Sequence, residues 1–353
     1  MSVNKLSKGT LYFIKENDFL DKSRSNYIKI GLVRGERTTK ERIADHQTGN
    51  PRELIDHLSL VSPMIDHLET FMHYEFAEYR INGEWFFMTD DQLQVTINRA
   101  NQIIEEQEET YKSLEQSKKL KNQVSNDKLL NSKDEFLKIW SEMKSRKFEC
   151  VVLKFQKKLI EEKIRQKLKH NGSIDGIARW NLKGGTEFFN EKQLKLDMPD
   201  IYESFLTLEE EKITGSFLFK GTKAIKKEFP SLYEEKQSME SLEIISEQIN
   251  MKKVVKRDED LETLHRDFIR LSSESNRKEW DYQKLEVKLK VIVGINAGIE
   301  DICTWNRELK SGKKFNKSEF QESHEDIYKR SIHIRPNTVA LDIHMFRPYT
   351  PMI

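Results

Sequence analysis

The chain contains an internal repeat, which constrains its fold more than any other feature of the sequence. Residues 172–181 read GSIDGIARWN and residues 297–306 read AGIEDICTWN, so that isoleucines, a tryptophan and an asparagine recur at the same spacing. A second match follows each segment, Phe189–Leu194 in the first copy and Phe315–Phe320 in the second. A third copy is partial and keeps Ile225, Pro230, Leu232 and Tyr233. Units this small need neighbours to bury their apolar faces, so we expect the copies to pack together.

Each copy predicts a helix, a tight polar turn, a short helix that carries the tryptophan, a basic loop and a helix that ends in an aromatic residue. The tryptophans have two interpretations, packing in a core or stacking on nucleic-acid bases beside lysines. A lysine-rich helix precedes the first copy, with seven basic and two acidic residues between Lys154 and Lys169. A solvated helix face is the alternative interpretation of these lysines. The candidates for contacts with nucleic acid are Lys157, Lys163, Lys167, Trp180 and Trp305.

Composition excludes several classes of protein. Of the 353 residues, 37% are apolar and 34% are charged, and the net charge is +1, so the whole chain is not a polybasic nucleic-acid binder. No apolar run approaches the ~20 residues of a membrane span, and the N-terminus lacks the apolar stretch of a signal peptide. Two cysteines, Cys150 and Cys303, allow neither a disulfide framework nor a four-ligand zinc site. These features predict a cytoplasmic protein without membrane contact.

Residues 10–100 have the pattern of a compact α+β domain, with a small mixed sheet flanked by helices. Segments rich in aromatic and β-branched residues predict strands, at residues 10–15, 26–33, 53–61 and 85–88. Polar caps before apolar periodicity predict helices, at residues 38–47, from a Ser62-Pro63 start to about Tyr79, and after Thr89.

The organisation along the chain predicts four regions. Residues 1–97 form the α+β domain, 98–147 a charged and mostly helical linker, 148–240 the first repeat with the partial copy, and 241–353 the second repeat with the C-terminal stretch. The run at residues 148–155, FECVVLKF, is predicted to be extended. The linker shows no persistent apolar heptads, which argues against an adaptor that oligomerises through it. The repeats still offer surfaces for a second copy or a protein partner.

One helix carries a carboxylate where an apolar side chain is expected. Around the helix that follows Pro63, Glu69 falls inside the stripe formed by Ile65, Leu68, Met72, Phe76 and Tyr79. A carboxylate there must be paired, protonated or bound to a cation, because unpaired burial costs several kcal/mol. On the helix before it, Arg42 and His46 are four residues apart and share a face, where an arginine can hold a phosphate and a histidine can exchange protons. The alternatives are a salt-bridged carboxylate and an ordinary surface pair.

Taken together, these residues resemble the GIY-YIG nuclease superfamily, and most closely its phage and bacterial subfamily whose second motif reads KIG. The resemblance spans roughly residues 9–90. The matching positions are Thr10-Leu11-Tyr12 for the first motif, Lys29-Ile30-Gly31 for the second, Arg42 with His46 and Leu68-Glu69 with His73 for the two helices, Gln47–Pro51 for a turn, and Gly83–Phe86 for the closing strand.

The resemblance implies a metal-dependent endonuclease that hydrolyses phosphodiester bonds in DNA. One Mg²⁺, which Mn²⁺ can replace, would sit on Glu69 and keep several waters. Arg42 would clamp the phosphate, and Tyr12, with Lys29 or His46, would help to deprotonate the attacking water.

Two positions depart from the family pattern, since Thr10 replaces a glycine and Lys29 replaces a tyrosine. Three further candidates follow from these departures and from the neighbouring motifs: Tyr27 on the same strand face as Lys29, His73, and Asn82.

A second resemblance concerns residues 291–330, which are similar to a segment near the C-terminus of YqaJ-like phage recombination exonucleases. It carries no catalytic residues and implies a module used by DNA-processing proteins. The leading hypothesis is a DNA endonuclease in phage–host conflict or DNA processing. The alternative is a catalytically weak or inactive nucleic-acid-binding or interaction protein on the same scaffold, which the replacement at Lys29 favours.

Overall fold

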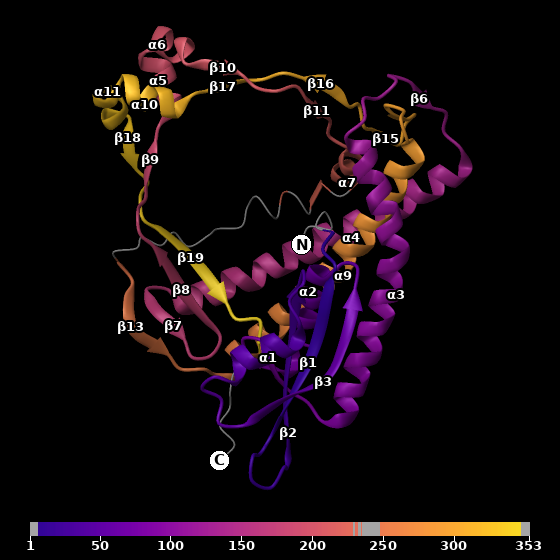
Figure 1. Ribbon diagram of the computed structural model, residues 1–353, viewed down its shortest axis with the longest axis vertical. Coiled ribbons are helices and arrows are strands. Elements are labelled where there is room, and N and C mark those ends of the chain that lie inside the picture. Colours follow the sequence, from indigo (N-terminus) through magenta and orange to yellow (C-terminus); the bar gives the residue numbers. More distant parts are fainter. Residues whose placement is uncertain (1–5, 229, 232–233, 235–247, 347–353) are drawn as a thin grey trace.

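The computed structural model describes residues 6–228, 230–231, 234 and 248–346. Figure 1 shows an N-terminal domain with a five-stranded sheet, two long helices that lie side by side behind it, and a curved pair of chain segments that rises from the ends of these helices. None of the helices in the described ranges is long and apolar enough to cross a membrane.

The N-terminal sheet has the order β3-β1-β2-β5-β4. Its strands are β1 (Gly9–Asn17), β2 (Arg24–Arg34), β3 (Glu53–Ser62), β4 (Arg80–Asn82) and β5 (Trp85–Phe87). Leu11, Phe13, Ile28 and Ile30 alternate along β1 and β2 and are fully buried in the domain core. The α+β class predicted from sequence is confirmed, and the strands pair antiparallel throughout rather than in mixed directions.

The helices of this domain follow their predicted positions, with one difference at a cap. They are α1 (Thr39–Gln47), α2 (Ile65–Glu75), the 3-10 turn η1 (Ala77–Tyr79) and α3 (Asp90–Lys121). Thr89 caps α3 with a capping box, as predicted. Ser62 is not the N-cap of α2, because Met64 holds that position. The Ser62 hydroxyl instead accepts a hydrogen bond from the Met64 amide and donates one to Gln107 on α3.

Two 35-residue helices, α4 (Asp134–Leu168) and α9 (Glu259–Val293), form what we call the frame. They are antiparallel, since Lys167 pairs with Asp260 at one end and Lys154 pairs with Glu279 further along. The predicted boundaries at 97/98 and 147/148 fall inside α3 and α4, and the run at 148–155 is helical rather than extended. The boundary at 240/241 lies outside the described residues.

After their frame helices, both copies of the repeat run through strands to two short helices and then through strands again, with three strands before the short helices in the first copy and four in the second. The first copy comprises β7 (Asn171–Ile174), β8 (Ala178–Lys183), β9 (Glu187–Phe189), α5 (Glu191–Asp197), α6 (Pro199–Ser204), β10 (Leu206–Leu208), β11 (Lys212–Thr214) and β12 (Leu218–Phe219). The second comprises β14 (Gly298–Ile299), β15 (Cys303–Thr304), β16 (Glu308–Lys310), β17 (Lys313–Phe315), α10 (Lys317–Ser323), α11 (Glu325–Arg330), β18 (Ile332–Ile334) and β19 (Thr338–Ile343).

The segments that carry the tryptophans are β-hairpins, so the predicted short helix is wrong. Both turns reverse at a left-handed residue, Gly176 with φ +66° and Asp301 with φ +57°, at equivalent places in the repeat. Small helices begin with equivalent caps further along, Asn190 in α5 and Asn316 in α10. Of the third, partial copy, α7 (Gly221–Glu228) and Pro230 are described, whereas Leu232 and Tyr233 lie outside the described residues.

Strands of one copy pair with strands of the other to form a curved double segment, residues 183–218 with residues 304–338, which we call the arch. The pairs are β8 with β19, β9 with β18, β10 with β17, β11 with β16 and β12 with β15. Between its two ribbons, aromatic rings from both copies pack together, with Phe189 and Tyr202 both stacked on Phe315. The arch ends are extended by two parallel pairings, β13 (Asn250–Val255) on β7 and β6 (Leu129–Leu130) on β14.

Both tryptophans belong to the core, which corrects their assignment to base stacking. Trp180 is 1% exposed and Trp305 is 2% exposed, so neither ring offers a face to a nucleotide. The Trp180 indole donates a hydrogen bond to the Lys169 carbonyl at the end of α4, and the Arg307 guanidinium lies 4.0 Å from the Trp305 ring centre. The tryptophans therefore join each hairpin to the end of its frame helix.

Trp180→Ala and Trp305→Ala should each lower the free energy of unfolding by about 3–5 kcal/mol, because a buried ring leaves a cavity. Urea unfolding measures this change, and Phe19→Ala, at an exposed loop position, should change stability by less than about 0.5 kcal/mol. If both variants kept wild-type stability but lost DNA affinity, the assignment to the core would fail.

Candidate active site

Glu69 and Arg42 line the same pocket, although they come from different helices. The pocket has a volume of about 490 Å³ and is lined by Leu32, Val33, Arg34, Arg37, Arg42, Glu69 and Glu84. Helix α2 positions Glu69 because Ile65, Leu68 and Met72 of the same helix are fully buried against the sheet. Glu69 itself is half-buried at the edge of this stripe.

The environment of Glu69 disfavours its charged form. Burial raises the pKa of Glu69 to about 7, and the neighbouring Glu84 carboxylate adds to that rise. Arg34 opposes the rise, but it is already paired with Asp66. A divalent cation in the pocket would instead favour the charged form of Glu69, because its positive charge would compensate both carboxylates.

Tyr12 lies under the same site, fully buried on β1 opposite Gly31 of β2. A Cβ on Gly31 would lie 2.3 Å from the Tyr12 hydroxyl oxygen, so the glycine of the second motif makes room for the ring. The hydroxyl has no hydrogen-bond partner of good geometry among the described residues. Burial raises the pKa of Tyr12, and the Arg42 guanidinium beside it opposes that rise only in part. Tyr12 is therefore a protonated donor at neutral pH.

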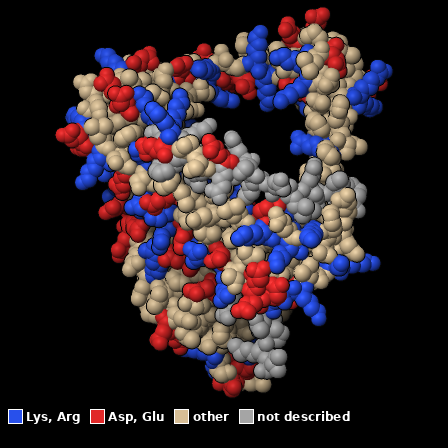
Figure 2. All heavy atoms as spheres, turned by 180° about the vertical axis from the view of Figure 1, so that it is seen from behind, with Lys and Arg blue, Asp and Glu red and all other residues tan. Residues whose placement is uncertain are grey.

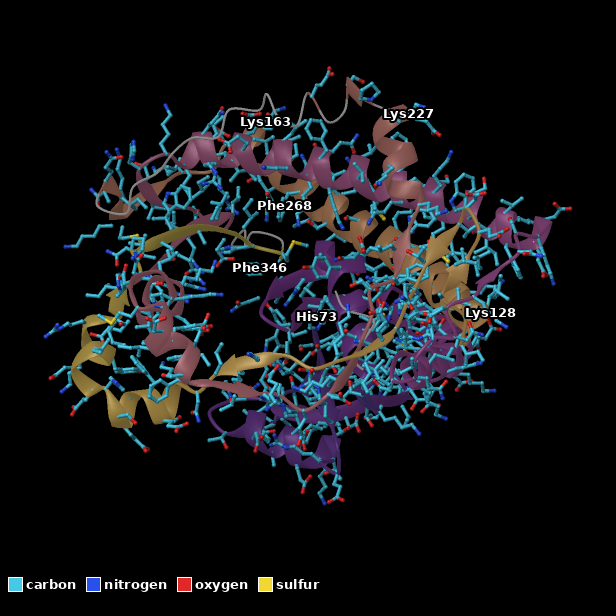
Figure 3. The ribbon with its side chains drawn as sticks, turned by 90° about the horizontal axis from the view of Figure 1, so that it is seen from above. His73, Lys128, Lys163, Lys227, Phe268 and Phe346 are labelled. Carbon is cyan, nitrogen blue, oxygen red and sulfur yellow. The ribbon has the colours of Figure 1, made fainter. Side chains whose placement is uncertain are left out.

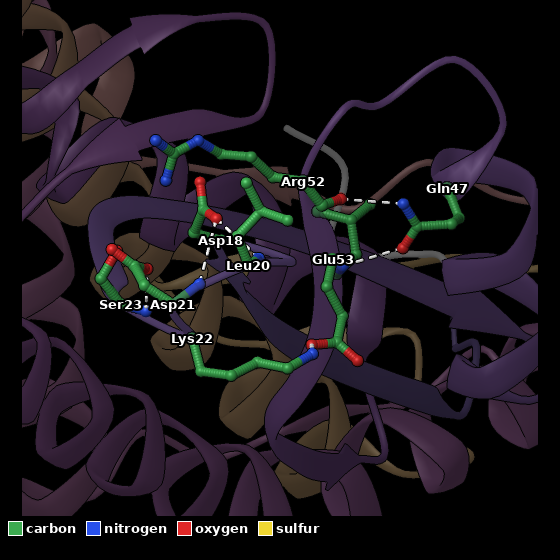
Figure 4. A network of polar contacts seen from close by, with 9 residues as sticks. Asp18, Leu20, Asp21, Lys22, Ser23, Gln47, Arg52 and Glu53 are labelled. Atoms are coloured by element: carbon green, nitrogen blue, oxygen red, sulfur yellow. Dashed lines mark hydrogen bonds and ion pairs between the residues drawn. The ribbon is translucent and has the colours of Figure 1, made fainter.

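Helix α1 presents Arg42 and His46 to the sheet. Thr38 starts the helix with a capping box, and the Gln47 side chain fixes the turn after it by donating to the Arg52 carbonyl and accepting from the Leu54 amide (Figure 4). Burial lowers the pKa of His46, and the cations Lys29 and Arg42 lower it further. His46 is therefore neutral near pH 7, and its buried Nε2 has no hydrogen-bond partner among the described residues.

Lys29 is 7% exposed and forms an ion pair with Glu84, its Nζ lying 2.8 Å from the carboxylate. It also lies 5.5 Å from the centre of the Trp85 ring. Glu84 was not among the residues predicted for the site. The signal that could have found it is its place in the Asn82-Gly83-Glu84 turn, directly before the strand that pairs with Lys29.

Lys29 and His46 line a separate pocket together with Trp85, and the three further candidates also lie outside the pocket of Glu69. Tyr27 is partly exposed near the far end of β2 and packs edge-on against Phe87. His73 is buried, and its Nε2 donates a hydrogen bond to the Ile30 carbonyl, which ties α2 to β2; burial lowers its pKa to about 4. Asn82 is exposed and lines a different cleft, with Arg179 of β8 and Asp342 of β19.

The lysines of α4 are mostly engaged within the frame. Lys157 lies 4.8 Å from the ring centre of Phe268 on α9, and Lys167 pairs with Asp260 at 2.7 Å. Lys163 is exposed on the same helix (Figure 3) and forms no ion pair within the described residues. The structure therefore gives two of these three lysines a role in holding α4 to α9.

No group of three or more histidine, cysteine or acidic side chains that could hold a metal ion occurs in the part of the chain that the structure describes. The pocket nevertheless suits a hard cation that keeps most of its water. Magnesium is commonly held by one or two carboxylates together with substrate phosphates. Glu69, with Glu84 across the pocket, supplies that donor chemistry, and the raised pKa of Glu69 indicates unsatisfied negative charge.

In metal-free protein, Glu69→Gln should raise the free energy of unfolding at about pH 8 by about 1–2 kcal/mol, allowing for solvent screening of a half-buried group. The sign follows because a carboxyl whose pKa rises on folding destabilises the folded state once it ionises. The gain should nearly vanish at about pH 4.5, where the carboxyl is protonated in the folded state and half protonated in the unfolded state. Chemical denaturation in the presence of a chelator measures this change in the free energy of unfolding. Glu108→Gln, at an exposed position of α3, is the control. Equal stability of Glu69→Gln and wild type at both pH values would contradict the described environment of Glu69.

Comparison with known proteins gives one match. Residues 9–101, roughly a quarter of the chain, match the family model of the T5orf172 domain. This domain is found in phage proteins associated with nucleases of the GIY-YIG and HNH-like kinds. No curated protein and no solved structure matches the chain. The matched range contains the whole five-stranded sheet and both helices of the candidate site, and it supports a nuclease-like or DNA-interacting role for this domain.

Proposed function

We propose that the chain is a metal-dependent DNA endonuclease whose active site is the pocket between α1, α2 and β5. The observation that carries the proposal is that Glu69, Arg42 and Glu84 line one pocket, with the Tyr12 hydroxyl beside Arg42. A match to a domain of nuclease-associated phage proteins supports it. The same match favours a role in phage–host conflict or DNA processing.

Arg42 is the group that would bind the scissile phosphate. Its guanidinium has five donors in a planar fork that fits two phosphate oxygens, and it can stabilise the negative charge that develops on them. The present partner of Arg42 is Asp45 at 3.7 Å, which leaves donors for a phosphate. Arg34 and Arg37 line the same pocket but are held by Asp66 and Asp45.

His46 is the group that would accept the proton of the attacking water. It is neutral near pH 7 and has an unpartnered nitrogen, as a general base requires. Tyr12, which keeps its proton, would orient the water or a phosphate oxygen as a hydrogen-bond donor. Lys29 is engaged in the ion pair with Glu84, so it would hold that carboxylate in place and attract phosphate.

Glu69 would hold the metal ion, and Glu84 lines the same pocket. Mg²⁺, or Mn²⁺ in its place, would polarise the phosphate and stabilise the leaving oxygen. The protein's own part is to orient Glu69 through the buried face of α2 and to shield it partly from bulk water, and the charge of a bound cation would favour its ionised form.

The second candidate function is DNA binding without cleavage. It is favoured by the ion pair between Lys29 and Glu84, because this pair occupies the position at which the superfamily resemblance places a tyrosine. Cleavage and binding measured on the same variants separate the two functions.

A plasmid-cleavage assay tests the proposal. Wild-type protein should nick or cut the plasmid in the presence of Mg²⁺, and EDTA should abolish this cleavage. Glu69→Ala should abolish cleavage, and Arg42→Ala and His46→Gln should each lower the rate by about 10²-fold or more. Arg24→Ala, which removes an exposed cation at the start of β2, should cleave like wild type. Equal cleavage by wild type and Glu69→Ala would reject the metal ligand, and binding without any cleavage would establish the second candidate function.

A further inference from the structure

A pocket of about 650 Å³ lies between the N-terminal domain and α9, apart from the candidate active site. One of its walls is the end of α2 with η1, and the other is α9, which packs against both elements. It shares no lining residue with the pocket of Glu69. Its volume falls within the range of about 300–1,000 Å³ that is usual for small-molecule sites, which often lie between domains.

The wall on the side of the N-terminal domain is aromatic. Tyr74 and Tyr79 line it, and both side chains are half-buried. The ring of Phe76 stacks on that of Tyr79 with centres 6.4 Å apart, and so holds Tyr79 from the domain core. A flat aromatic ligand gains stacking and burial against tyrosine rings.

The wall formed by α9 contains a buried acceptor without a donor. His265 lines the pocket and is 0% exposed. Its Nε2 lies 2.7 Å from the His344 carbonyl and must donate to it, so Nδ1 is an acceptor in the neutral ring. Burial lowers the pKa of His265, which keeps the ring neutral near pH 7. Nδ1 has no hydrogen-bond partner within the described ranges, and an N–H group of a ligand at this wall would supply one.

Two arginines of the same wall have no counter-ion. Arg266 and Arg277 are exposed, line the pocket and form no ion pair within the part of the chain that the structure describes. Arg266 donates a hydrogen bond only to Thr263 of its own helix. Most other charged groups of the walls are already paired: Arg270 with Asp267 and Glu274, and Glu75 with Arg99. Glu78, which is exposed, is the remaining carboxylate.

Arg277 stays free because Lys284 occupies the carboxylates beside it. Lys284 pairs with Glu106 and with Asp281, and these three residues line a neighbouring pocket of about 250 Å³ together with Arg277. Arg266 and Arg277 are eleven residues apart, so they lie on one face of α9 at a spacing of about 16 Å. Long arginine side chains can reach towards each other from these positions, and the guanidinium fork fits phosphate oxygens.

The charge around the pocket suits a small anion better than a nucleic-acid duplex. The face of the molecule drawn in Figure 2 carries Lys and Arg side chains interspersed with Asp and Glu side chains. Electrostatic binding of a duplex needs many neutralised phosphates, whereas two unpaired arginines match the few phosphates of one small ligand.

We propose that this pocket binds a nucleoside polyphosphate, with its base against Tyr74 and Tyr79 and its phosphates on Arg266 and Arg277. The proposal goes beyond the nuclease activity and stands whether or not the candidate active site cleaves DNA. Because α2 forms one wall and also carries Glu69, a bound nucleotide would join the helix of the candidate metal ligand to α9.

Calorimetric titration of the full-length protein tests the proposal, with EDTA present so that no metal-bound nucleotide enters the pocket of Glu69. The probes are ATP, GTP, CTP and UTP, and each is compared with its nucleoside and with inorganic tripolyphosphate. Arg266→Ala and Arg277→Ala each remove one unpaired cation, and Ser273→Trp fills the pocket from α9. Arg330→Ala, at an exposed position of α11 outside the pocket, is the matched control. Circular dichroism checks that each variant is folded.

We expect at least one triphosphate to bind with a Kd below about 1 mM, and roughly tenfold more tightly than its nucleoside or tripolyphosphate. Arg266→Ala and Arg277→Ala should each weaken binding by about tenfold, because each removes a charge-assisted contact with phosphate. Ser273→Trp should abolish binding, and Arg330→Ala should bind like wild type.

Three results would overturn the proposal. The first is the absence of binding for all four triphosphates, and the second is equal binding of tripolyphosphate, which would leave the tyrosine wall without a role. The third is binding that survives all three pocket substitutions or is lost instead in Arg42→Ala, which would place the nucleotide in the candidate active site. None of these measurements involves cleavage, so their failure is distinct from failure of the nuclease assignment.

Discussion

Helix α9 is the element on which the other parts of this molecule depend, because it packs against the arch-bearing helix α4 on one side and the N-terminal domain on the other. Towards α4, Lys154 and Glu279 form an ion pair. Towards the N-terminal domain, the ring of Trp280 stacks on His67 with centres 3.7 Å apart, and Lys284 pairs with Glu106. His67 precedes Glu69 by two residues on α2, so the packing of α9 also fixes the helix that carries the candidate metal ligand.

The candidate site is built at a cost in stability that the surrounding core offsets. Around Glu69, α2 is anchored by neutral buried histidines: His67 Nδ1 accepts a hydrogen bond from the Gln107 side-chain amide, and His73 donates to the Ile30 carbonyl. Burial lowers the pKa of His67 to about 3, so it stays uncharged and adds no cation that would compete for Glu69. The cations that line the described pocket with Glu69 are arginines, and all three are paired with aspartates. This arrangement leaves Glu69 without a full counter-charge, which is the condition that a metal-binding carboxylate needs.

The N-terminal domain could be predicted well because its signals are local. The aromatic and β-branched residues of β1 and β2, the polar cap at Thr89 and the apolar stripe around Glu69 each lie within a few residues of sequence. The frame and the arch could not be predicted in this way, because their contacts join segments that are far apart in the sequence. The buried stripe of α3 carries Thr96, Gln107 and Ser117, so no apolar heptad is visible. The tryptophan segments have helix-like isoleucine spacing, but a left-handed residue turns each into a hairpin. Each hairpin is completed by a strand of the other copy and by a strand that precedes the other copy's frame helix.

The arch joins the two copies of the repeat firmly, although each of its strand pairs is only marginally stable. Two-stranded ribbons are marginal on their own, because they bury little apolar surface. Here each ribbon is anchored at the frame by a hairpin with a buried tryptophan and at its far end by the aromatic cluster around Phe315. Separation of one short strand pair therefore leaves the two copies attached, whereas their full separation needs every pair and the aromatic cluster to come apart together. Local opening along the ribbons is thus compatible with a lasting attachment of the two copies.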